Sequence, residues 1–507
     1  MANLWRTKPM DQLVRDTRRE GTRLHRALTV TQLTALGIGA MIGAGIFASI
    51  GSAAAGGSEH VGAGPAVALS FVIVAVACGF AALCYAEFTS MVPVAGSAYT
   101  YAYATLGELV AWIIGWDLIL EYAVGNVAVA ISWSGYFQEL LRGFGLHWPA
   151  WLGIDWRTAE QAAAAVARAA GDPGALKALG ESTLRHAGAL EHAPHLLGAP
   201  LVFNLPAVLV TVGITWLLVR GIRDSARFNT VMVVVKLLII GFFVVLGAFY
   251  VKPEHWTPFA PNGLKGISSA AAIIFFAYIG FDAISTTAEE AKNPQRDLPR
   301  SIVASLAICA VIYVVVAVVL TGMVPWRQLG TAEPLATAFS NLGIRWAAAI
   351  ISVGAVVATT SVLFVFQIGQ TRIFFAMARD GLLPAWASRV HPRFRTPHVT
   401  TILTGVFVAA FSGITNINEM VELTNIGTLF AFVLVALGVI VLRRREPERP
   451  RPFRTPWVPV VPLLAVAACG YLMVNLPWVT WIRFFLWLAV GLVIYFLYSA
   501  PRSRLAR

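Results

Sequence analysis

The sequence predicts an all-α polytopic membrane protein. Of its 507 residues, 58% are hydrophobic and only 13% are charged, which is too apolar for a soluble chain of this length. The apolar residues form segments long enough to cross a bilayer, and the basic residues lie in the short loops between them. The net charge of +12 therefore indicates orientation in a lipid bilayer, and no folded basic face for nucleic acid is expected.

Twelve apolar segments match the length of a membrane-spanning helix, which is about 20 residues or somewhat more when the helix is tilted. They lie near residues 31–55, 64–92, 104–137, 201–219, 227–250, 265–287, 301–323, 345–376, 398–414, 418–442, 457–475 and 481–498. The sequence therefore predicts twelve transmembrane helices, preceded by an N-terminal segment, 1–30, and followed by a tail, 499–507.

The basic residues set the expected orientation, because short loops rich in Lys and Arg stay on the cytoplasmic side. If the spans alternate, 27 of the 38 Lys and Arg residues fall on the side of both termini, 10 fall on the other side and Lys236 lies within a span. We therefore expect a multi-pass protein of the cell membrane with both termini in the cytoplasm and loop 138–200 outside. The basic start of the chain has no apolar core or cleavage site, so no removable signal peptide is expected.

The long loop 138–200 contains good helix formers from Thr158 to Ala170 and again up to about Leu190, with a break at 171–174. We expect one or two short helices over the outer mouth. The histidines in or near this loop are His147, His186, His192 and His195. Their spacing matches no standard zinc motif, so no metal site is expected. The four cysteines lie in apolar segments and are expected to be core residues without a disulfide or metal role.

The first span contains four glycines between Gly37 and Gly45. Each glycine weakens a helix by about 1 kcal/mol relative to alanine. One interpretation is close helix packing, because Gly39 and Gly43 are spaced as a contact between small residues. The other is a discontinuous helix whose exposed backbone amides bind a carboxylate near the middle of the membrane. The glycine run alone leaves both interpretations open.

The sixth span is also interrupted, by Gly280 and Asp282 within an apolar run. If residues 31–250 and 265–442 are two halves of five spans each, the first and sixth spans occupy corresponding places. An odd number of spans makes the second half enter from the opposite side, which gives an inverted repeat, and residues 457–498 add two more spans. Paired interrupted helices in such a repeat favour a midplane binding site in a secondary transporter.

Four stretches of the sequence carry a family resemblance. They are Ile42-Gly43-Ala44-Gly45-Ile46-Phe47, the run from Tyr85 to Tyr101, Ala277-Tyr278-Ile279-Gly280-Phe281-Asp282 and Phe375-Ala376-Met377-Ala378-Arg379-Asp380-Gly381-Leu382-Leu383-Pro384. Together they resemble the amino acid–polyamine–organocation superfamily, and within it the cationic amino acid transporter family, over about residues 25–445. The resemblance implies a leucine-transporter-like 5+5 inverted repeat plus two extra helices. It also implies sodium-independent, usually proton-linked transport of amino acids, with no cofactor.

An amino acid substrate presents a carboxylate and an ammonium, and each needs its own partners. Backbone amides of the interrupted first span suit the carboxylate, and carbonyls of the unwound sixth span suit the ammonium. Small residues of the eighth span either line a side-chain pocket or pack helices. The expected substrate-binding residues are Ile42, Gly43, Ala44, Gly45, Phe276, Ala277, Ile279, Phe281 and Thr360. For Phe281 a thin gate and plain packing stay open. Asp282 either pairs with a substrate cation or caps the second half of the span.

Lys236 and Glu121 are the expected proton-coupling residues. Lys236 lies about two turns into the fifth span, where snorkelling towards the cytoplasm is the alternative. In the family that the chain resembles, the matching lysine places its ammonium against the broken first helix, where relatives bind sodium. Glu121 lies near the centre of the third span, and carboxylates within a membrane face cavities or partners. It binds a proton, senses a distal charge of the substrate or makes a structural hydrogen bond, and the sequence leaves these open.

The sequence therefore predicts a permease that moves cationic or small neutral L-amino acids by proton-coupled, sodium-independent alternating access. An amino acid exchanger, and a membrane sensor that binds amino acids without transporting them, are the alternatives. A membrane-embedded enzyme would need a convergent catalytic set, and neither Lys236 nor Glu121 neighbours a nucleophile motif. The expected partners are the substrate, protons and the lipid bilayer, and the oligomeric state does not follow from the sequence.

Overall fold

The structure is a computed structural model that describes residues 6–9, 28–57, 60–92, 94, 97–170, 179–196, 198–220, 225–394 and 396–504. The elements of the first half are α2 (Val30–Met41), η1 (Gly45–Ser49), α3 (Ile50–Ala55), η2 (Gly64–Ala66), α4 (Val67–Met91), α5 (Ser97–Thr105), α6 (Glu108–Ile119), η3 (Leu120–Val124), α7 (Gly125–Gly143), η4 (Ala150–Leu152), α8 (Trp156–Ala169), α10 (Gly180–Ala187), α11 (Ala189–His192), β1 (His195–Leu196), β2 (Ala199–Pro200), α12 (Leu205–Arg220) and α13 (Ser225–Ala248). Those of the second half are η5 (Pro253–Trp256), α14 (Gly263–Ile274), η6 (Phe275–Tyr278), η7 (Asp282–Glu290), α15 (Pro294–Met323), η8 (Trp326–Leu329), α16 (Pro334–Asn341), α17 (Arg345–Arg379), η9 (Ala385–Ser388), α18 (His398–Ile414), α19 (Ile417–Arg445), α20 (Val460–Val474), α21 (Trp478–Ile494), η10 (Tyr495–Ser499) and α22 (Ala500–Arg502).

Helices long and apolar enough to cross a membrane dominate the described residues. Nine such segments are present there: Val30–Ala55, Gly64–Met91, Glu108–Gly143, Thr230–Ala248, Gly263–Glu290, Pro294–Met323, Arg345–Arg379, Ile417–Arg445 and Trp478–Arg502. Three shorter apolar helices, α12, α18 and α20, lie where three further spans are predicted from the sequence. The helical, polytopic membrane architecture is therefore confirmed, while the number twelve stays a prediction.

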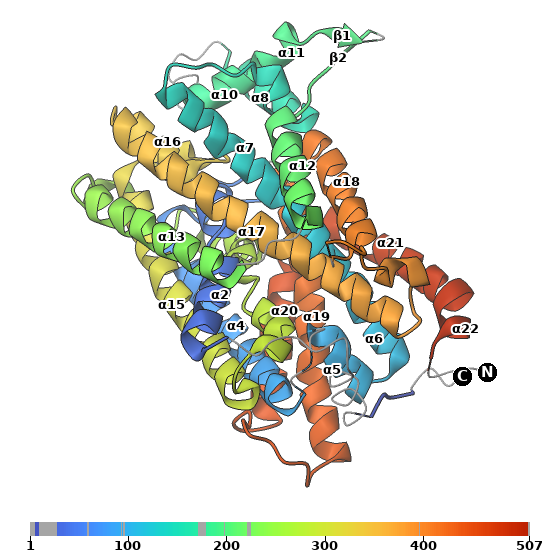
Figure 1. Cartoon of the computed structure of the whole chain (residues 1–507). Helices are drawn as coiled ribbons and strands as arrows, with labels where there is room; N and C mark the ends of the chain where they lie inside the picture. Colours follow the sequence, from blue (N-terminus) through green and yellow to red (C-terminus); the bar gives the residue numbers. More distant parts are fainter. Residues whose placement is uncertain are drawn as a thin grey trace.

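The long helices pack side by side into one bundle (Figure 1). Helix α4 contacts α15, α7 contacts α17, and α12 contacts α18, so segments far apart in the sequence form neighbouring pairs. Helices α8, α10 and α11 lie at one end of the bundle, which we call the loop side because residues 138–200 form it (Figure 1). Both termini lie towards the other end, which we call the termini side (Figure 1).

The loop side carries the short helices that the sequence predicts. Helix α8 begins after Asp155, whose side chain accepts a hydrogen bond of 3.0 Å from the backbone N–H of Thr158 and so caps the helix. The predicted break at 171–174 lies outside the described residues. Beyond α11 the chain forms a two-residue antiparallel hairpin, β1 and β2, which the all-α prediction did not include.

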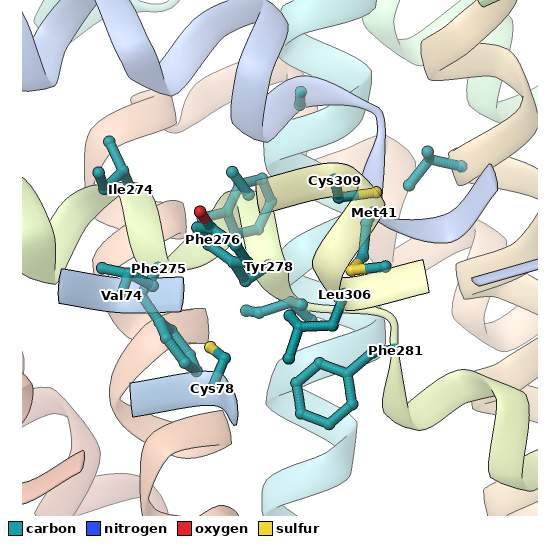
Figure 2. Packing of buried hydrophobic residues seen from close by; sticks show 14 of the residues in the cluster. Met41, Val74, Cys78, Ile274, Phe275, Phe276, Tyr278, Phe281, Leu306 and Cys309 are labelled. Carbon is teal, nitrogen blue, oxygen red and sulfur yellow. The ribbon is translucent and has the colours of Figure 1, made fainter. Parts of the chain in front are cut away.

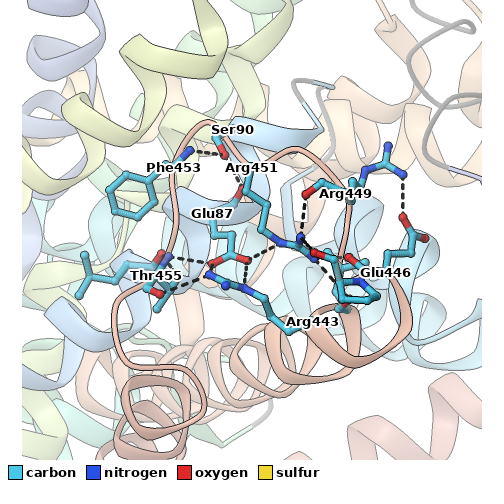
Figure 3. Close-up of polar contacts among 11 residues, drawn as sticks. Glu87, Ser90, Arg443, Glu446, Arg449, Arg451, Phe453 and Thr455 are labelled. Carbon is cyan, nitrogen blue, oxygen red and sulfur yellow. Dashed lines mark hydrogen bonds and ion pairs between the residues drawn. The ribbon is translucent and has the colours of Figure 1, made fainter.

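On the termini side, the loop between α19 and α20 is fastened to the end of α4 by Glu87 (Figure 3). The buried Glu87 carboxylate accepts hydrogen bonds from Arg443 at 2.8 and 2.9 Å and from the backbone N–H of Thr455 at 2.8 Å. The guanidinium of Arg451 lies 3.2 Å from the same carboxylate. A buried carboxylate is stable only when it is paired and hydrogen-bonded, and Glu87 has both kinds of partner.

Two further carboxylates hold both ends of the chain on the termini side. The Asp380 carboxylate accepts a hydrogen bond of 3.1 Å from the ammonium of Lys8, and the Asp380 carbonyl accepts one of 3.1 Å from the backbone N–H of Arg504. The Glu108 side chain is bonded to the Ser503 hydroxyl, and the Glu108 N–H donates to the Arg6 carbonyl at 3.0 Å. Residues near both ends of the chain therefore share one anchoring region.

Candidate functional site

The first span is interrupted between α2 and α3. Helix α2 starts with a capping box in which Thr29 and Gln32 bond each other's backbone N–H groups, and it ends at Met41. Ile42 is extended, with φ −75° and ψ 93°, and a π-helical turn, η1, follows from Gly45. The break therefore falls within the glycine-rich run, and the discontinuous helix is confirmed.

The sixth span is interrupted as well. Helix α14 gives way to the 3₁₀ turn η6, and Ile279 is extended. Gly280 has a φ of +119°, which residues other than glycine rarely adopt. The chain then continues as the 3₁₀ segment η7. The Asp282 carboxylate accepts a 3.3 Å hydrogen bond from the N–H of Gly280, so it stabilises the unwound segment. Asp282 is the first residue of η7, and the residue at the N-cap position is Phe281.

The two interruptions meet each other. A Cβ atom on Gly45 would stand 2.2 Å from the Cα of Ala277, and one on Gly280 would stand 2.8 Å from the Cβ of Ala40. The glycines thus let the two broken helices approach at backbone distance, which is also the packing role that the sequence left open. Met41 lies in the same buried cluster as the side chains of the sixth span (Figure 2).

Lys236 of α13 bonds the end of the first half-helix. Its ammonium donates a hydrogen bond of 2.6 Å to the carbonyl of Gly39, and its side chain is fully buried. Gly39 belongs to the last turn of α2, whose carbonyls have no partner within the helix. In an apolar interior such a carbonyl must find a donor, and Lys236 provides it. The ammonium therefore lies against the broken helix in this conformation and does not snorkel to the membrane surface.

Asn425 does the same for the sixth span, and sequence reasoning missed it. Its side-chain amide donates hydrogen bonds of 2.8 and 2.9 Å to the carbonyls of Ala272 and Ile273, in the last turn of α14. The available signal was an asparagine within the apolar run of α19, two residues before Gly427. Each interrupted helix thus has at least one carbonyl of its last turn bonded by a polar side chain from another span.

Glu121 lies beside the sixth-span interruption. It is fully buried in the π-helical turn η3, and neither carboxylate oxygen makes a hydrogen bond with the described residues. Asp282 is near enough for the two carboxylates to interact electrostatically. The hydroxyl of Tyr122, another residue that sequence reasoning missed, lies 3.5 Å from Asp282. Asp282 and the hydroxyl of Thr428 both lie close to the Glu121 carboxylate, so the structural role considered for Glu121 stays open beside the proton-binding role.

The remaining expected binding residues are mostly buried around the two interruptions. Ile42, Gly43, Ala44, Phe276 and Ile279 are all buried there. Their predicted contacts to substrate stay predictions.

Three predicted contacts have protein partners in this conformation. The Ala277 carbonyl, expected to accept from a substrate ammonium, accepts a 2.8 Å hydrogen bond from the hydroxyl of Tyr313. Phe281 packs against Tyr85, with ring centroids 5.9 Å apart, as in the packing alternative (Figure 2 shows its ring). Thr360 accepts a 2.9 Å hydrogen bond from the indole N–H of Trp133. Binding of a substrate by Ala277 or Thr360 therefore requires a second acceptor direction or a rearrangement.

The fold and this geometry define a class of protein. Two interrupted spans that meet in the interior, with a buried ammonium and buried carboxylates beside them, are typical of a membrane transporter with a midplane site. The amino acid permease family model matches residues 28–498, so the chain belongs to the amino acid permease family. The chain is a transporter and not an enzyme, as its relatives are.

Individual relatives extend this result. The branched-chain amino acid permease BcaP of Bacillus subtilis (strain 168) is 46% identical over 504 residues, which covers 99% of each chain. The methylthioribose transporter of the same organism is 44% identical over 505 residues and covers 100% of each chain. The vacuolar cationic amino acid transporter 4 of Arabidopsis thaliana is 37% identical over 432 residues, 84% of this chain and 64% of that one. The predicted superfamily is therefore confirmed. The names of the relatives give different substrates: branched-chain amino acids, methylthioribose and cationic amino acids.

Proposed function

We propose that this permease moves cationic or small neutral L-amino acids across the cell membrane by proton-coupled, sodium-independent alternating access. The observation that carries the proposal is the buried ammonium of Lys236 on the Gly39 carbonyl, at the end of the interrupted first half-helix. A cation fixed at this place interacts favourably with the carbonyl end of the half-helix, as a bound metal cation would. Unlike a metal ion, it can also bind and release a proton. Two halves, 31–250 and 265–442, related as an inverted repeat, give the rocking motion that alternating access needs.

The substrate carboxylate is proposed to bind the amides of Ile42 to Gly45, and the ammonium the carbonyls of Phe276 to Ile279. The support is that both segments interrupt the regular α-helix, are buried and contact each other. A relative named for cationic amino acids and one named for branched-chain amino acids favour an α-amino acid as the common ligand. The relative named for methylthioribose favours a second candidate, a thiosugar without either charge.

Glu121 and Asp282 are proposed as the second proton-binding group. Both are fully buried within the spans, and among the described residues no ion pair joins either of them to a cation. Charged carboxylates in such surroundings are costly, and proton uptake removes the cost. Their place at the sixth-span interruption puts proton binding next to the segment that is proposed to move.

Uptake into proteoliposomes tests the proposed function. We expect the purified protein to accumulate at least one of L-arginine, L-lysine, L-alanine and L-leucine when an inward proton gradient is imposed, and to do so equally with sodium or choline outside. Empty liposomes are the control. Accumulation only when the liposomes are preloaded with amino acid would indicate the exchanger, binding without uptake the sensor, and uptake of 5-methylthioribose alone the thiosugar candidate. Dependence on sodium would contradict the coupling proposal.

Cysteine labelling tests the proposed orientation, in which the termini side is cytoplasmic. Ala170 is exposed and directly follows α8 on the loop side. Glu448 is exposed between α19 and α20 on the termini side. In a background without the four native cysteines, an impermeant thiol reagent should label Ala170→Cys in intact cells and Glu448→Cys only after permeabilisation. The reverse pattern would contradict the orientation, and labelling of both in detergent confirms that each site is reactive.

A further inference from the structure

A cavity lies on the loop side of the bundle, outside the central site that the two interrupted helices form. It has a volume of about 270 Å³, and α8 and α10 cover it. Its floor includes Ala48, Ser49 and Ser52, which directly follow the interruption of the first span. This volume lies just below the range of about 300–1,000 Å³ that is usual for small-molecule sites, and it suits a ligand as small as an amino acid.

Glu333 places a carboxylate in this cavity. The residue is only 4% exposed and precedes α16, but its side chain makes no capping hydrogen bond to that helix. Within the part of the chain that the structure describes, no hydrogen bond or ion pair of this carboxylate is found. Burial raises the pKa of the Glu333 carboxyl above its ordinary value, and the nearby guanidinium of Arg142 opposes this shift. A buried carboxylate without a bonded partner gains from a cationic ligand.

The same cavity also contains cations. Arg142 of α7 and Arg185 of α10 both line it, and Arg142 is ion-paired with Glu139. Burial and these two guanidinium groups lower the pKa of His186 to about 3, so this imidazole is neutral at neutral pH and offers hydrogen bonds rather than charge. The lining therefore includes the Glu333 carboxylate, the Asp155 carboxylate that caps α8, and two guanidinium groups, and such a mixture of charges is complementary to a zwitterion.

The floor of the cavity offers a further polar group that lacks a partner. The hydroxyl of Ser49 is buried and makes no hydrogen bond with the described residues. Ser49 ends η1, one turn beyond Gly45. The cavity is therefore built directly on the interrupted helix, and a ligand in it would be one helical turn from the proposed central site.

We infer that this cavity is a second binding site for the α-amino and α-carboxylate groups of an amino acid, occupied before the ligand reaches the central site. The ammonium binds Glu333, the carboxylate lies towards Arg142 and Arg185, and Ser49 bonds the ligand at the floor. Helices α8 and α10 cover the ligand. The inference rests on the proposed function, since it takes its ligand class from it, but the site is separate from the glycine-lined interruption.

Protection of a cysteine from a thiol reagent tests the site directly. Ser182 of α10 lines the cavity, so Ser182→Cys in a background without native cysteines gives a reporter on its wall. L-arginine and L-leucine are the probes, and the central site is disabled by Gly45→Ala. We expect at least one probe to slow modification by a methanethiosulfonate reagent severalfold, and Glu333→Gln to abolish this protection. Glu191→Gln, an exposed carboxylate of α11 away from the cavity lining, is the matched control and should leave protection intact.

Transport provides the second measurement. In proteoliposomes, Glu333→Gln should raise KM for the transported amino acid about tenfold, because one charge-assisted hydrogen bond is lost, while the maximum rate stays within about twofold. Glu191→Gln should change neither value. A wild-type KM in Glu333→Gln, or equal protection with and without the Glu333 carboxylate, would overturn the second site.

These outcomes separate the inference from the proposed function. A protein that transports amino acids but shows no protection of Ser182→Cys has only the central site, and the inference is then wrong while the proposed function stands. A protein that neither transports nor binds any of the probes overturns both. Protection that persists in Gly45→Ala and depends on Glu333 supports the second site independently of the central one.

Discussion

Replacing Lys236 with alanine is expected to abolish amino acid accumulation driven by an inward proton gradient. The change removes the ammonium that lies 2.6 Å from the Gly39 carbonyl, and it leaves that buried carbonyl without its donor. It also removes the group that is proposed to carry the proton between the two conformations. We expect uptake under the gradient to fall at least about tenfold, towards the level of empty liposomes. The measurement is the initial rate at several external pH values.

Two further variants make this result specific. Lys236→Arg should still bind substrate but transport it slowly at every pH, because arginine keeps its proton. Lys252→Ala removes an exposed lysine beyond the end of the same helix and should leave uptake unchanged. If Lys236→Ala still concentrates amino acid on a proton gradient, the coupling group lies elsewhere, and Glu121 with Asp282 is the next candidate.

Substituting alanine for Gly45 is expected to destroy the central site. The added Cβ would stand 2.2 Å from the Cα of Ala277 and 2.7 Å from the Ala277 nitrogen, both in the backbone of the sixth span. Real Cβ atoms do not approach a backbone so closely, so the two interruptions must separate. Because the proposed ligand bridges them, we expect the affinity for the transported amino acid to fall at least about tenfold. Binding of the radiolabelled amino acid to protein in lipid nanodiscs measures this.

Gly241→Ala is the matched control. Outside the backbone of α13 itself, no atom of the described residues lies within 4 Å of a Cβ built there, and the position is exposed. Alanine also favours a helix over glycine by about 1 kcal/mol. This variant should bind and transport like the wild type. A monodisperse profile in size-exclusion chromatography shows whether Gly45→Ala is folded and inserted. Wild-type affinity in folded Gly45→Ala would contradict the site assignment.

The interruptions were predictable because their cause is local. Glycines spaced through an apolar run weaken a helix whatever surrounds it. Gly280 adopts a positive φ, which glycine allows by itself without help from a neighbouring side chain. The depth of Lys236 in its span was also predictable, because a lysine within an apolar run must face a partner or a cavity inside the bundle. The Gly39 carbonyl that accepts its hydrogen bond lies 197 positions away in the sequence. Which carbonyl the ammonium reaches depends on how α13 packs on α2, and the local sequence does not predict that packing.

The partners of the binding groups were less predictable, because they come from distant spans. The hydroxyl of Tyr313 occupies the Ala277 carbonyl, and the indole of Trp133 occupies Thr360. Asn425 was missed because one asparagine in an apolar helix has many structural uses. Its role appears only when α19 is packed against the end of α14.

Charged residues in the loops were the least predictable. In the sequence, Glu333 has the pattern of an ordinary loop charge, and Glu87 is expected near the end of the second span as a structural or gate contact whose partner is not specified. Glu333 becomes a buried carboxylate, without a hydrogen bond from the described residues, where α7, α8 and α10 together line the cavity. Glu87 meets Arg443 across 356 positions. In both cases burial follows from the tertiary arrangement, which hydrophobic periodicity does not describe.

The anchoring of both chain ends on Glu108 and Asp380 has a mechanical consequence. Glu108 begins α6 and Asp380 directly follows α17, and each is bonded to one residue from either end of the chain. A motion that separates α6 from α17 therefore loosens the two ends together, and groups that share partners are released cooperatively. A fluorescence donor on one tail and an acceptor on the other start close together, so one drop in energy-transfer efficiency would time the opening of this side of the molecule.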